Sequence, residues 1–288
     1  MFLIIGAVIV FASVIGGYMA IGGHLIVLWQ PFEVVIICGA ALGAFIIGNP
    51  KTVVVGVLKS FGPILRGPKY KKDDYLELLS MLYAIFKLAK SKGMLALEQH
   101  VENPHESDLF ANFPKAAAEH HAMTFLCDYL RLLTLGTENA FEVEALMDEE
   151  LDTHHKENHV LSSAIQSVAD GMPALGIVAA VLGVIHTMGS ITEPPEILGH
   201  LIGGALVGTF LGVWFSYGFI APIGNSLKSV HDAEAKYLGC VKSAILAYMQ
   251  GYAPAVAVEF ARKALLSHVR PTFYEVEEAV QSVPAPSP

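Results

Sequence analysis

The chain has 288 residues, of which 53% are hydrophobic and only 16% are charged, and its formal net charge is -9 at pH 7. This composition favours a membrane protein, because two soluble domains of this total length would need more charged surface. The acidic balance argues against a nucleic-acid partner, since such partners select surfaces rich in Lys and Arg. The three cysteines lie far apart and form no C-x-x-C pair, so neither a disulfide framework nor a zinc knuckle is indicated.

The N-terminal part of the chain contains two apolar segments. Residues 2–21 contain no charged side chain and match the roughly 20 residues that a spanning helix needs. They lack the basic region and the cleavage site of a signal peptide, so we expect them in the mature protein. The second segment, residues 32–48, ends before Asn49 and Pro50. We therefore predict transmembrane helices 1 and 2 within residues 1–50.

A helical cytoplasmic domain is predicted next, in residues 51–168, which are rich in helix formers. Asp73 and Asp74 can cap a helix in which apolar side chains recur at near-helical spacing. No proline interrupts residues 115–172. A long helix can therefore continue from this domain into the third span.

Two further apolar segments, residues 172–191 and 201–225, are also long enough to cross a bilayer. They place transmembrane helices 3 and 4 within residues 169–225. The predicted fold is an all-α integral membrane protein with four transmembrane helices and a large helical cytoplasmic domain.

The C-terminal part is predicted to leave the membrane. Residues 226–270 are expected to form a cytoplasmic helical extension, with one helix running from Ser226 to about Arg262. Residues 271–288 are expected to form a flexible tail, because the last residues are rich in Pro and Ser and have little apolar surface to bury.

The positive charges indicate the orientation in the membrane. All 18 Lys and Arg residues lie in two segments, residues 51–156 and 228–270, and none lies in a span or a short connector. By the positive-inside rule both segments are cytoplasmic, so both termini are expected inside.

Glycines recur at four-residue spacing within the spans, and such stripes let helix backbones approach closely. Two interpretations stay open: packing within one subunit and contact between subunits. The glycines are Gly39 and Gly43, Gly199 and Gly203, and Gly204, Gly208 and Gly212.

The clustered histidines are candidates for a metal site, but we expect none there. His155 and His159 share a helical face. However, the stretch is strongly acidic, which is typical of a solvated helix face, and the order His-Glu-x-x-His is absent. His120, His121 and His154 belong to the same group. The sequence also contains no nucleophile elbow, phosphate loop or dinucleotide fingerprint, so no enzyme is expected.

The predicted spans contain no Asp, Lys or Arg, and Glu33 falls at an outer edge. His186, at about the middle of the third span, is the strongest titratable candidate within them. Because a proton path normally needs a titratable group inside the membrane, we expect a partner protein to supply the carboxylate.

Two prolines lie at the predicted cytoplasmic ends of the third and fourth spans. Pro173 follows Asp170 by about one turn, and Pro222 lies at the matching end of the fourth span. A proline removes a backbone donor and bends a helix, which neighbouring helices in a membrane can tolerate. The pair indicates either a hinge or two tolerated packing kinks.

Several long motifs in the same order resemble the MotA family of flagellar stator proteins, over nearly the whole chain. They are DYLR at 128–131, FEVEALMDEE at 141–150, DGMPALGIVAAVLGVIH at 170–186, VGTFLG at 207–212, YGFIAP at 217–222 and GYAPAVAVEF at 251–260.

The resemblance is to the longer, proton-driven branch of this MotA/TolQ/ExbB superfamily. It implies a multi-pass protein of the bacterial inner membrane that forms a pentamer around a MotB dimer, in contact with lipid. With MotB, which supplies the missing carboxylate, it would form a proton channel and convert ion flow into torque on the rotor protein FliG. It implies no cofactor beyond the proton.

The resemblance also implies residue roles. Lys90, Glu98 and Glu150 map to charged rotor-contact positions, with Lys where well-known members have Arg, so the planar bidentate donor is replaced by a point charge. The proton path and its conformational coupling are assigned to Asp170, Pro173, Ala180, Thr209, Tyr217 and Pro222. Sodium-driven relatives have a hydroxyl side chain at the position of Ala180, and its absence here favours protons.

Three alternative functions are compatible with parts of the sequence. An energiser resembling ExbB or TolQ would have three spans instead of four. A stand-alone ion channel would need its own polar pathway through the membrane, which only His186 and a few hydroxyls offer. A membrane-bound metal enzyme would have to use the clustered histidines.

Overall fold

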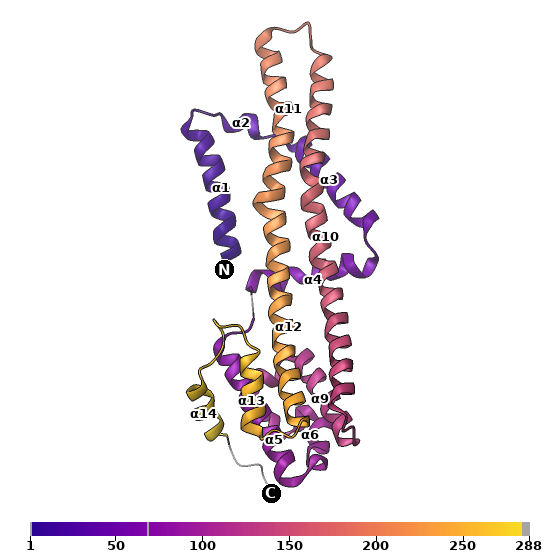
Figure 1. The fold of residues 1–288 in the computed structure, drawn as a ribbon. Helices are drawn as coiled ribbons and strands as arrows, with labels where there is room; N and C mark the ends of the chain where they lie inside the picture. The colour runs from indigo at the N-terminus through magenta and orange to yellow at the C-terminus, as the bar shows by residue number, and fades with distance from the viewer. Residues whose placement is uncertain (1, 68, 284–288) are drawn as a thin grey trace. The chain divides into compact units, whose positions relative to one another are not determined.

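The computed structural model describes residues 2–67 and 69–283, and over those residues it contains helices and no β-strand (Figure 1). The chain divides into two compact units. We call residues 1–68 with 156–231 the apolar unit, and residues 69–155 with 232–288 the polar unit. Helices α10 and α12 contribute residues to both.

The apolar unit contains the four predicted spans. It comprises α1 (Phe2–Ala20), α2 (Leu25–Leu28), α3 (Pro31–Gly48), α4 (Lys51–Arg66), the second part of α10 (Ala140–Met188), α11 (Pro195–Phe215), the π-helical turn η3 (Ser216–Ile220) and the start of α12 (Ala221–Met249). Four stretches in the described residues are long and apolar enough to cross a membrane, which confirms the four-span fold. They are 2–20, 25–48, and parts of 140–188 and 195–249.

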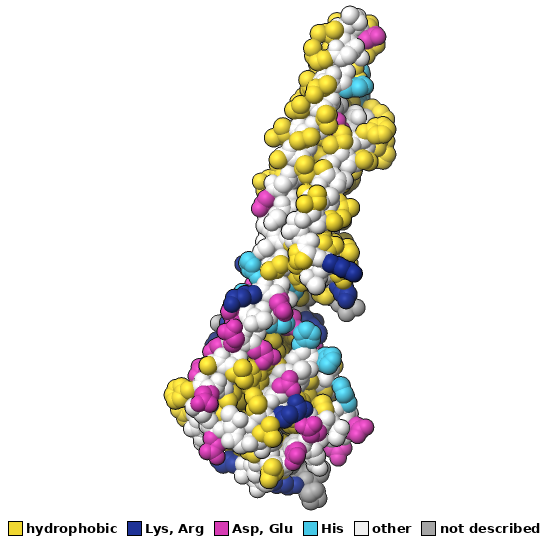
Figure 2. All heavy atoms as spheres, turned by 90° about the vertical axis from the view of Figure 1, so that its right-hand side faces the viewer, with side chains coloured by type: hydrophobic (Ala, Val, Ile, Leu, Met, Phe, Trp, Pro, Cys, Tyr) yellow, Lys and Arg dark blue, Asp and Glu magenta, His cyan; other side chains and the backbone are white. Residues whose placement is uncertain are grey.

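The apolar unit exposes most of its hydrophobic side chains. None of the described residues of α1 is buried. On the face shown in Figure 2, apolar side chains cover most of this unit, whereas Lys, Arg, Asp and Glu gather on the polar unit. This surface suits contact with lipid, because lipid tails are as apolar as the side chains that they meet.

Helix α4 differs from the predicted domain boundary, because residues 51–66 pack in the apolar unit and not with the cytoplasmic domain expected at 51–168. The helix is amphipathic and needs a partner for its apolar face. Residues 156–168 of α10 lie in the same unit for the same reason. The cluster formed by these elements is Val53, Val57 and Ile64 from α4, Ala164 and Ile165 from α10, and Leu227 from α12.

The polar unit is built around α5 (Lys72–Lys92). The backbone N–H of Lys71 donates to the Asp74 carboxylate at 2.8 Å, which caps the start of the helix as predicted. The other elements are η1 (Met94–Leu97), α6 (Glu98–Glu102), η2 (Pro104–Glu106), α7 (Asp108–Ala111), α8 (Pro114–Ala117), α9 (His120–Thr134), the start of α10, the end of α12, α13 (Pro254–Lys263) and α14 (Phe273–Gln281).

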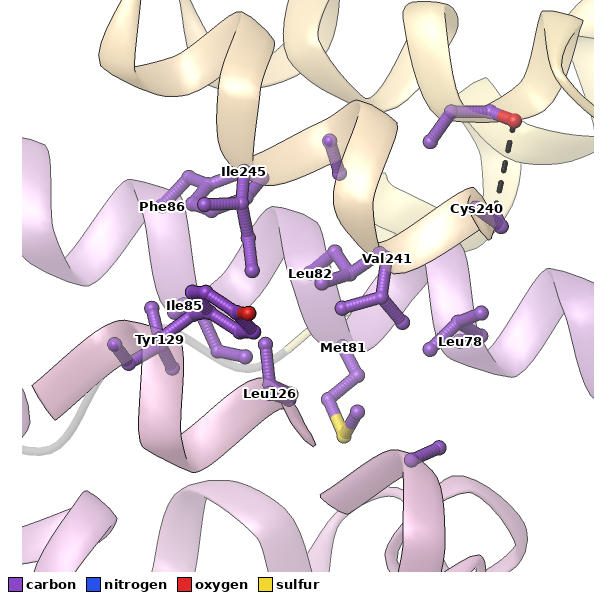
Figure 3. Close-up of a cluster of buried hydrophobic side chains, with 14 of the residues drawn as sticks. Leu78, Met81, Leu82, Ile85, Phe86, Leu126, Tyr129, Cys240, Val241 and Ile245 are labelled. Carbon is purple, nitrogen blue, oxygen red and sulfur yellow. Dashed lines mark hydrogen bonds between the residues drawn. The ribbon is translucent and has the colours of Figure 1, made fainter. Parts of the chain in front are cut away.

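The core of the polar unit forms where α5 meets α9 and α12 (Figure 3). Leu82 and Ile85 of α5 are fully buried, and so are Leu126 of α9 and Val241 of α12. The Cys240 thiol lies within hydrogen-bond distance of the Ala261 carbonyl, at 3.5 Å. The cysteines do not pair with one another and are free thiols.

The C-terminal part differs from two predictions. The helix expected from Ser226 to about Arg262 ends at Met249, because Gly251 has a φ of +88° and reverses the chain before α13 begins at Pro254. Residues 273–281 form α14 instead of a flexible tail. Thr272 and Glu275 form a capping box, and Val276 is buried against the core, so this segment does have apolar surface to bury. Residues 284–288 lie outside the described residues.

Candidate functional site

Helices α10 and α11 run antiparallel in direct backbone contact within the apolar unit (Figure 1). A Cβ built on Gly212 would lie 2.7 Å from the carbonyl oxygen of Met172 and 2.8 Å from the Cα of Gly176. A Cβ on Gly176 would lie 2.8 Å from the carbonyl oxygen of Gly208. No side chain larger than hydrogen fits at these positions, so the two helices form a close seam.

The seam shows which of the recurring glycines pack within one subunit, an alternative that the sequence left open. Gly204, Gly208 and Gly212 pack against other elements of the same subunit. In contrast, a Cβ built on Gly39 or Gly199 would meet no described atom within 4 Å. The first group therefore serves packing within one subunit.

A hydrogen bond joins the two helices beside Pro173. In a regular helix the N–H of residue 173 would donate to the carbonyl of Ala169, but proline has no N–H. The Ser216 hydroxyl donates to that carbonyl instead, at 2.6 Å, and Ser216 is 0% exposed. The sequence analysis did not single out Ser216. The available signal was a serine six residues before Pro222, near the predicted cytoplasmic end of the fourth span, where the third span has Pro173.

The helix geometry differs at the two prolines. Helix α10 continues through Pro173, whereas the π-helical turn η3 ends two residues before Pro222. In this turn the Ala221 N–H donates to the Ser216 carbonyl, five residues earlier. Such turns occur frequently at functional sites. Ser216 thus begins the irregular turn before Pro222, and its hydroxyl donates to the Ala169 carbonyl that Pro173 leaves without a backbone donor.

The remaining residues assigned to the inner end of the path lie around this bond. Asp170 is exposed and accepts a hydrogen bond from the Gln166 side chain at 2.8 Å. Tyr217, next to Ser216, is 64% exposed. Pro222 is exposed and lines a cavity of about 510 Å³ together with residues of α1. The Ala169 to Ser216 bond brings Asp170 and Tyr217 to the same level of the helix pair.

Ala180 and Thr209 lie two to three turns along the same seam. The backbone nitrogen of Ala180 lies 3.0 Å from the position of a Cβ on Gly208, and Thr209 follows Gly208 in the chain. Both Ala180 and Thr209 are partly buried. The structure therefore brings the two positions assigned to ion choice to one level.

Glu33 lies in the first turn of α3, at one end of the span as predicted, and its carboxylate faces α10 and α11. Its Oε1 atom lies 3.4 Å from a Cβ built on Gly183, and its Oε2 atom 2.7 Å from one built on Gly208. Oε2 is buried and has no hydrogen-bond partner among the described residues. The glycines leave space for this carboxylate, which hydropathy along a single helix does not reveal.

His186 was predicted near the middle of the third span, and the structure corrects this position. It lies in the last turn of α10, which ends at Met188, and its side chain is exposed. The helix ends there because Gly189 and Ser190 form a turn.

The charged residues assigned to the rotor contact all lie exposed on the polar unit. Lys90 lies in the last turn of α5 and lines a cavity of about 670 Å³ with Glu138 and Tyr248, among others. Glu98 begins α6. Glu150 of α10 accepts a hydrogen bond from the Tyr129 hydroxyl at 2.7 Å. Burial raises the pKa of Tyr129, and the bond to Glu150 and its charge raise it further, so the hydroxyl stays protonated as a donor.

The structure groups the histidines differently from the sequence pattern. His121, His154 and Glu234, from α9, α10 and α12, have potential ligand atoms within 4.8 Å of one another. The predicted pair His155 and His159 is not part of this group. His121 Nδ1 lies 3.4 Å from the Glu234 carboxylate, which is an ion pair when the histidine is protonated. The group links three helices of the polar unit.

The sequence matches known families over most of its length. Residues 4–93 match the family described as motility protein A N-terminal, and residues 116–239 match the MotA/TolQ/ExbB proton channel family. Proteins called motility protein A in Salmonella typhimurium and Escherichia coli are each 45% identical to this chain, over 100% and 99% of its length and 97% of theirs. The chemotaxis protein LafT of Vibrio parahaemolyticus is 32% identical over 95% of this chain and 96% of that protein.

Two solved structures are similar in fold. One is MotAB of C. jejuni, with a TM-score of 0.77 and 20% identity, matched over 92% of this chain and 95% of that one. The other is the flagellar MotAB stator complex of Bacillus subtilis, with a TM-score of 0.70 and 25% identity, matched over 89% and 92%.

Proposed function

The chain belongs to the motility protein A family, and we propose that it is the MotA-type subunit of a flagellar stator, which conducts protons with a MotB partner and converts their flow into torque. The observation that carries this proposal is the 45% identity to motility protein A of two bacteria over essentially the full length. The fold, with four candidate spans, supports it against an energiser resembling ExbB or TolQ, which has three.

The ion path is proposed to run beside the seam of α10 and α11. MotB supplies the carboxylate that titrates, at the level of Ala180 and Thr209. Ala180 offers no side-chain oxygen for a dehydrated sodium ion, which supports protons as the ion. Asp170 is exposed at the inner end of the seam and can pass protons to the cytoplasm.

Protonation of the MotB carboxylate removes a charge from a low-dielectric interface, which changes the energy of that interface by several kcal/mol. The backbone contact between Gly176 and Gly212 makes α10 and α11 move together. The same helices α10 and α12 that contain Pro173 and Pro222 also contribute to the polar unit, so a movement at the prolines has a direct covalent route to it.

The polar unit is proposed to deliver the force. Lys90, Glu98 and Glu150 are exposed and suit contact with charged residues of FliG, because exposed ion pairs are individually weak and detach readily. The assembly is proposed to be a pentamer around a MotB dimer in the bacterial inner membrane, with both termini cytoplasmic. The 18 Lys and Arg residues, all outside the spans, support this orientation.

The test is a strain that lacks this gene and any second stator set. We expect filaments in normal number, counted by electron microscopy, that do not rotate, and rotation restored by the wild-type gene. Glu98→Lys should restore the protein level but not full swimming. Normal swimming of the deletion strain, or paralysis caused by missing filaments, would contradict the proposed function.

A further inference from the structure

We propose that Ser216 is a positioning residue for the movement that drives rotation: its hydroxyl replaces the N–H that Pro173 lacks and holds the two proline-containing segments in register. The inference rests on the proposed function and adds a residue that the family motifs did not single out. The bond from Ser216 Oγ to the Ala169 carbonyl measures 2.6 Å, between residues 47 positions apart in the chain.

Ser216 behaves differently from other serines of the structure. A serine in a helix usually donates to a carbonyl of its own helix three or four residues earlier. Ser60, Ser162 and Ser243 do so, with bonds to Gly56, His159 and Gly239. The Ser216 hydroxyl instead crosses to another helix, and it reaches the one carbonyl that Pro173 deprives of its regular donor.

Ser216 also ends a continuous antiparallel seam. Built Cβ positions show Gly183 against Ala205, Gly208 against Ala179, and Gly212 against Gly176 and Met172. The next pair along the two helices is Ala169 with Ser216. The close approaches between α10 and α11 at Gly176, Gly183, Gly208 and Gly212 involve backbone atoms and small side chains. The Ser216 hydroxyl instead makes a directional hydrogen bond, which fixes the register at the inner end of the seam.

The bond lies where movement would be transmitted. Ser216 begins the π-helical turn before Pro222, and Ala169 lies one turn before Pro173. In a bilayer no water is at hand to replace a lost partner of a buried carbonyl. Loss of the hydroxyl therefore leaves Ala169 without this donor and frees the two segments to shift relative to each other.

The first test compares Ser216→Ala with Ser162→Ala in a strain without another stator. Ser162 is a matched control, because it is a buried serine of the same unit whose hydroxyl bonds to its own helix. Torque steps in tethered cells report both the number of units in a motor and the torque of each unit. A purely structural role would lower only the number of units.

For Ser216→Ala we expect the rate of proton-driven stepping per unit to fall by on the order of tenfold, the effect of one lost buried hydrogen bond in the driving transition. Ser216→Thr, which keeps the hydroxyl, should retain part of the wild-type stepping rate. Unchanged torque per unit in Ser216→Ala, at normal unit number, would overturn the proposal.

A second test does not need rotation. Pro173→Ala restores the N–H that can donate to the Ala169 carbonyl, so Ser216 becomes redundant. In the purified protein, Ser216→Ala should lower the melting temperature when Pro173 is present and have little effect in the Pro173→Ala background. An equal decrease in both backgrounds would show that Ser216 acts only by filling space. This cycle remains informative even if the deletion strain disproves the stator function.

Discussion

The Glu33 carboxylate of α3 occupies the space beside Gly208 of α11, where a built Cβ would lie 2.7 Å from Oε2. Oε2 is buried without a hydrogen-bond partner among the described residues. A titratable side chain inside a transmembrane bundle is costly and usually functional. The seam of α10 and α11 thus has a carboxylate of this chain at one level and the proline pair at its inner end.

Glu33→Gln should keep the shape of the side chain and remove its ability to ionise. We expect the melting temperature of the purified complex to stay close to that of the wild type, since the amide has nearly the same size and shape as the carboxyl group. Swimming speed should fall, because a titratable group beside the ion path is lost. Glu196→Gln, in the exposed first turn of α11, is the control. Wild-type speed for Glu33→Gln would show that the carboxyl only fills space.

Gly212→Ala should disrupt the seam. The new methyl group would lie 2.7 Å from the Met172 carbonyl oxygen, and the atoms in its way are backbone atoms that cannot rotate aside. Overpacking of this kind costs roughly 1–3 kcal/mol. Gly199→Ala places its methyl group in open space and should be neutral. Thermal unfolding of the two purified variants decides the point, and equal stability would mean that α10 and α11 separate easily.

Tyr129→Phe should release the Glu150 side chain, which the Tyr129 hydroxyl holds at 2.7 Å. The aromatic packing against Phe125 remains, so we expect a loss of only about 1 kcal/mol in stability. If Glu150 contacts the rotor, swimming should weaken at an unchanged protein level. Tyr83→Phe, a change to a tyrosine of α5, provides the comparison. Equal swimming of both variants would show that the bond from Tyr129 to Glu150 does not contribute to the rotor contact.

The docking of α14 should depend on pH. The Lys72 side chain, 2.6 Å from the Glu275 carboxylate, and the Thr272 N–H and hydroxyl lower the pKa of Glu275 from 4.5 to about 2. Because this folded-state pKa is lowered, the stabilisation is fully present above pH 4.5 and is lost as the pH falls towards 2.

Comparison of the wild type with Glu275→Gln tests this dependence. The difference in melting temperature between the two purified proteins should be constant above pH 4.5 and shrink steadily below it. For Glu277→Gln, a change at an exposed glutamate of the same helix, the difference in melting temperature from the wild type should not shrink below pH 4.5. A difference that stays constant down to pH 2 would mean that the ion pair does not form in solution.

Some expectations failed because short segments depend on distant partners. The flexible tail was inferred from Pro and Ser at the very end, but Val276 finds a buried place against the core around α5. Helix α4 was assigned to the cytoplasmic domain by its lysines, but its apolar face packs with α10 and α12. In both cases the position of an amphipathic helix depends on which neighbouring apolar surface buries its apolar face.

The sequence by itself determined the four spans, because span length and hydropathy are properties of contiguous residues. It also located the two prolines at the ends of the spans, and its motifs indicated the family. Only the tertiary structure decided that Ser216 serves Ala169, that Glu33 fits beside Gly208, and which glycines pack within the subunit. These relationships join residues far apart in sequence, where spacing carries no information. They depend on which helix faces meet and on how closely the backbones approach.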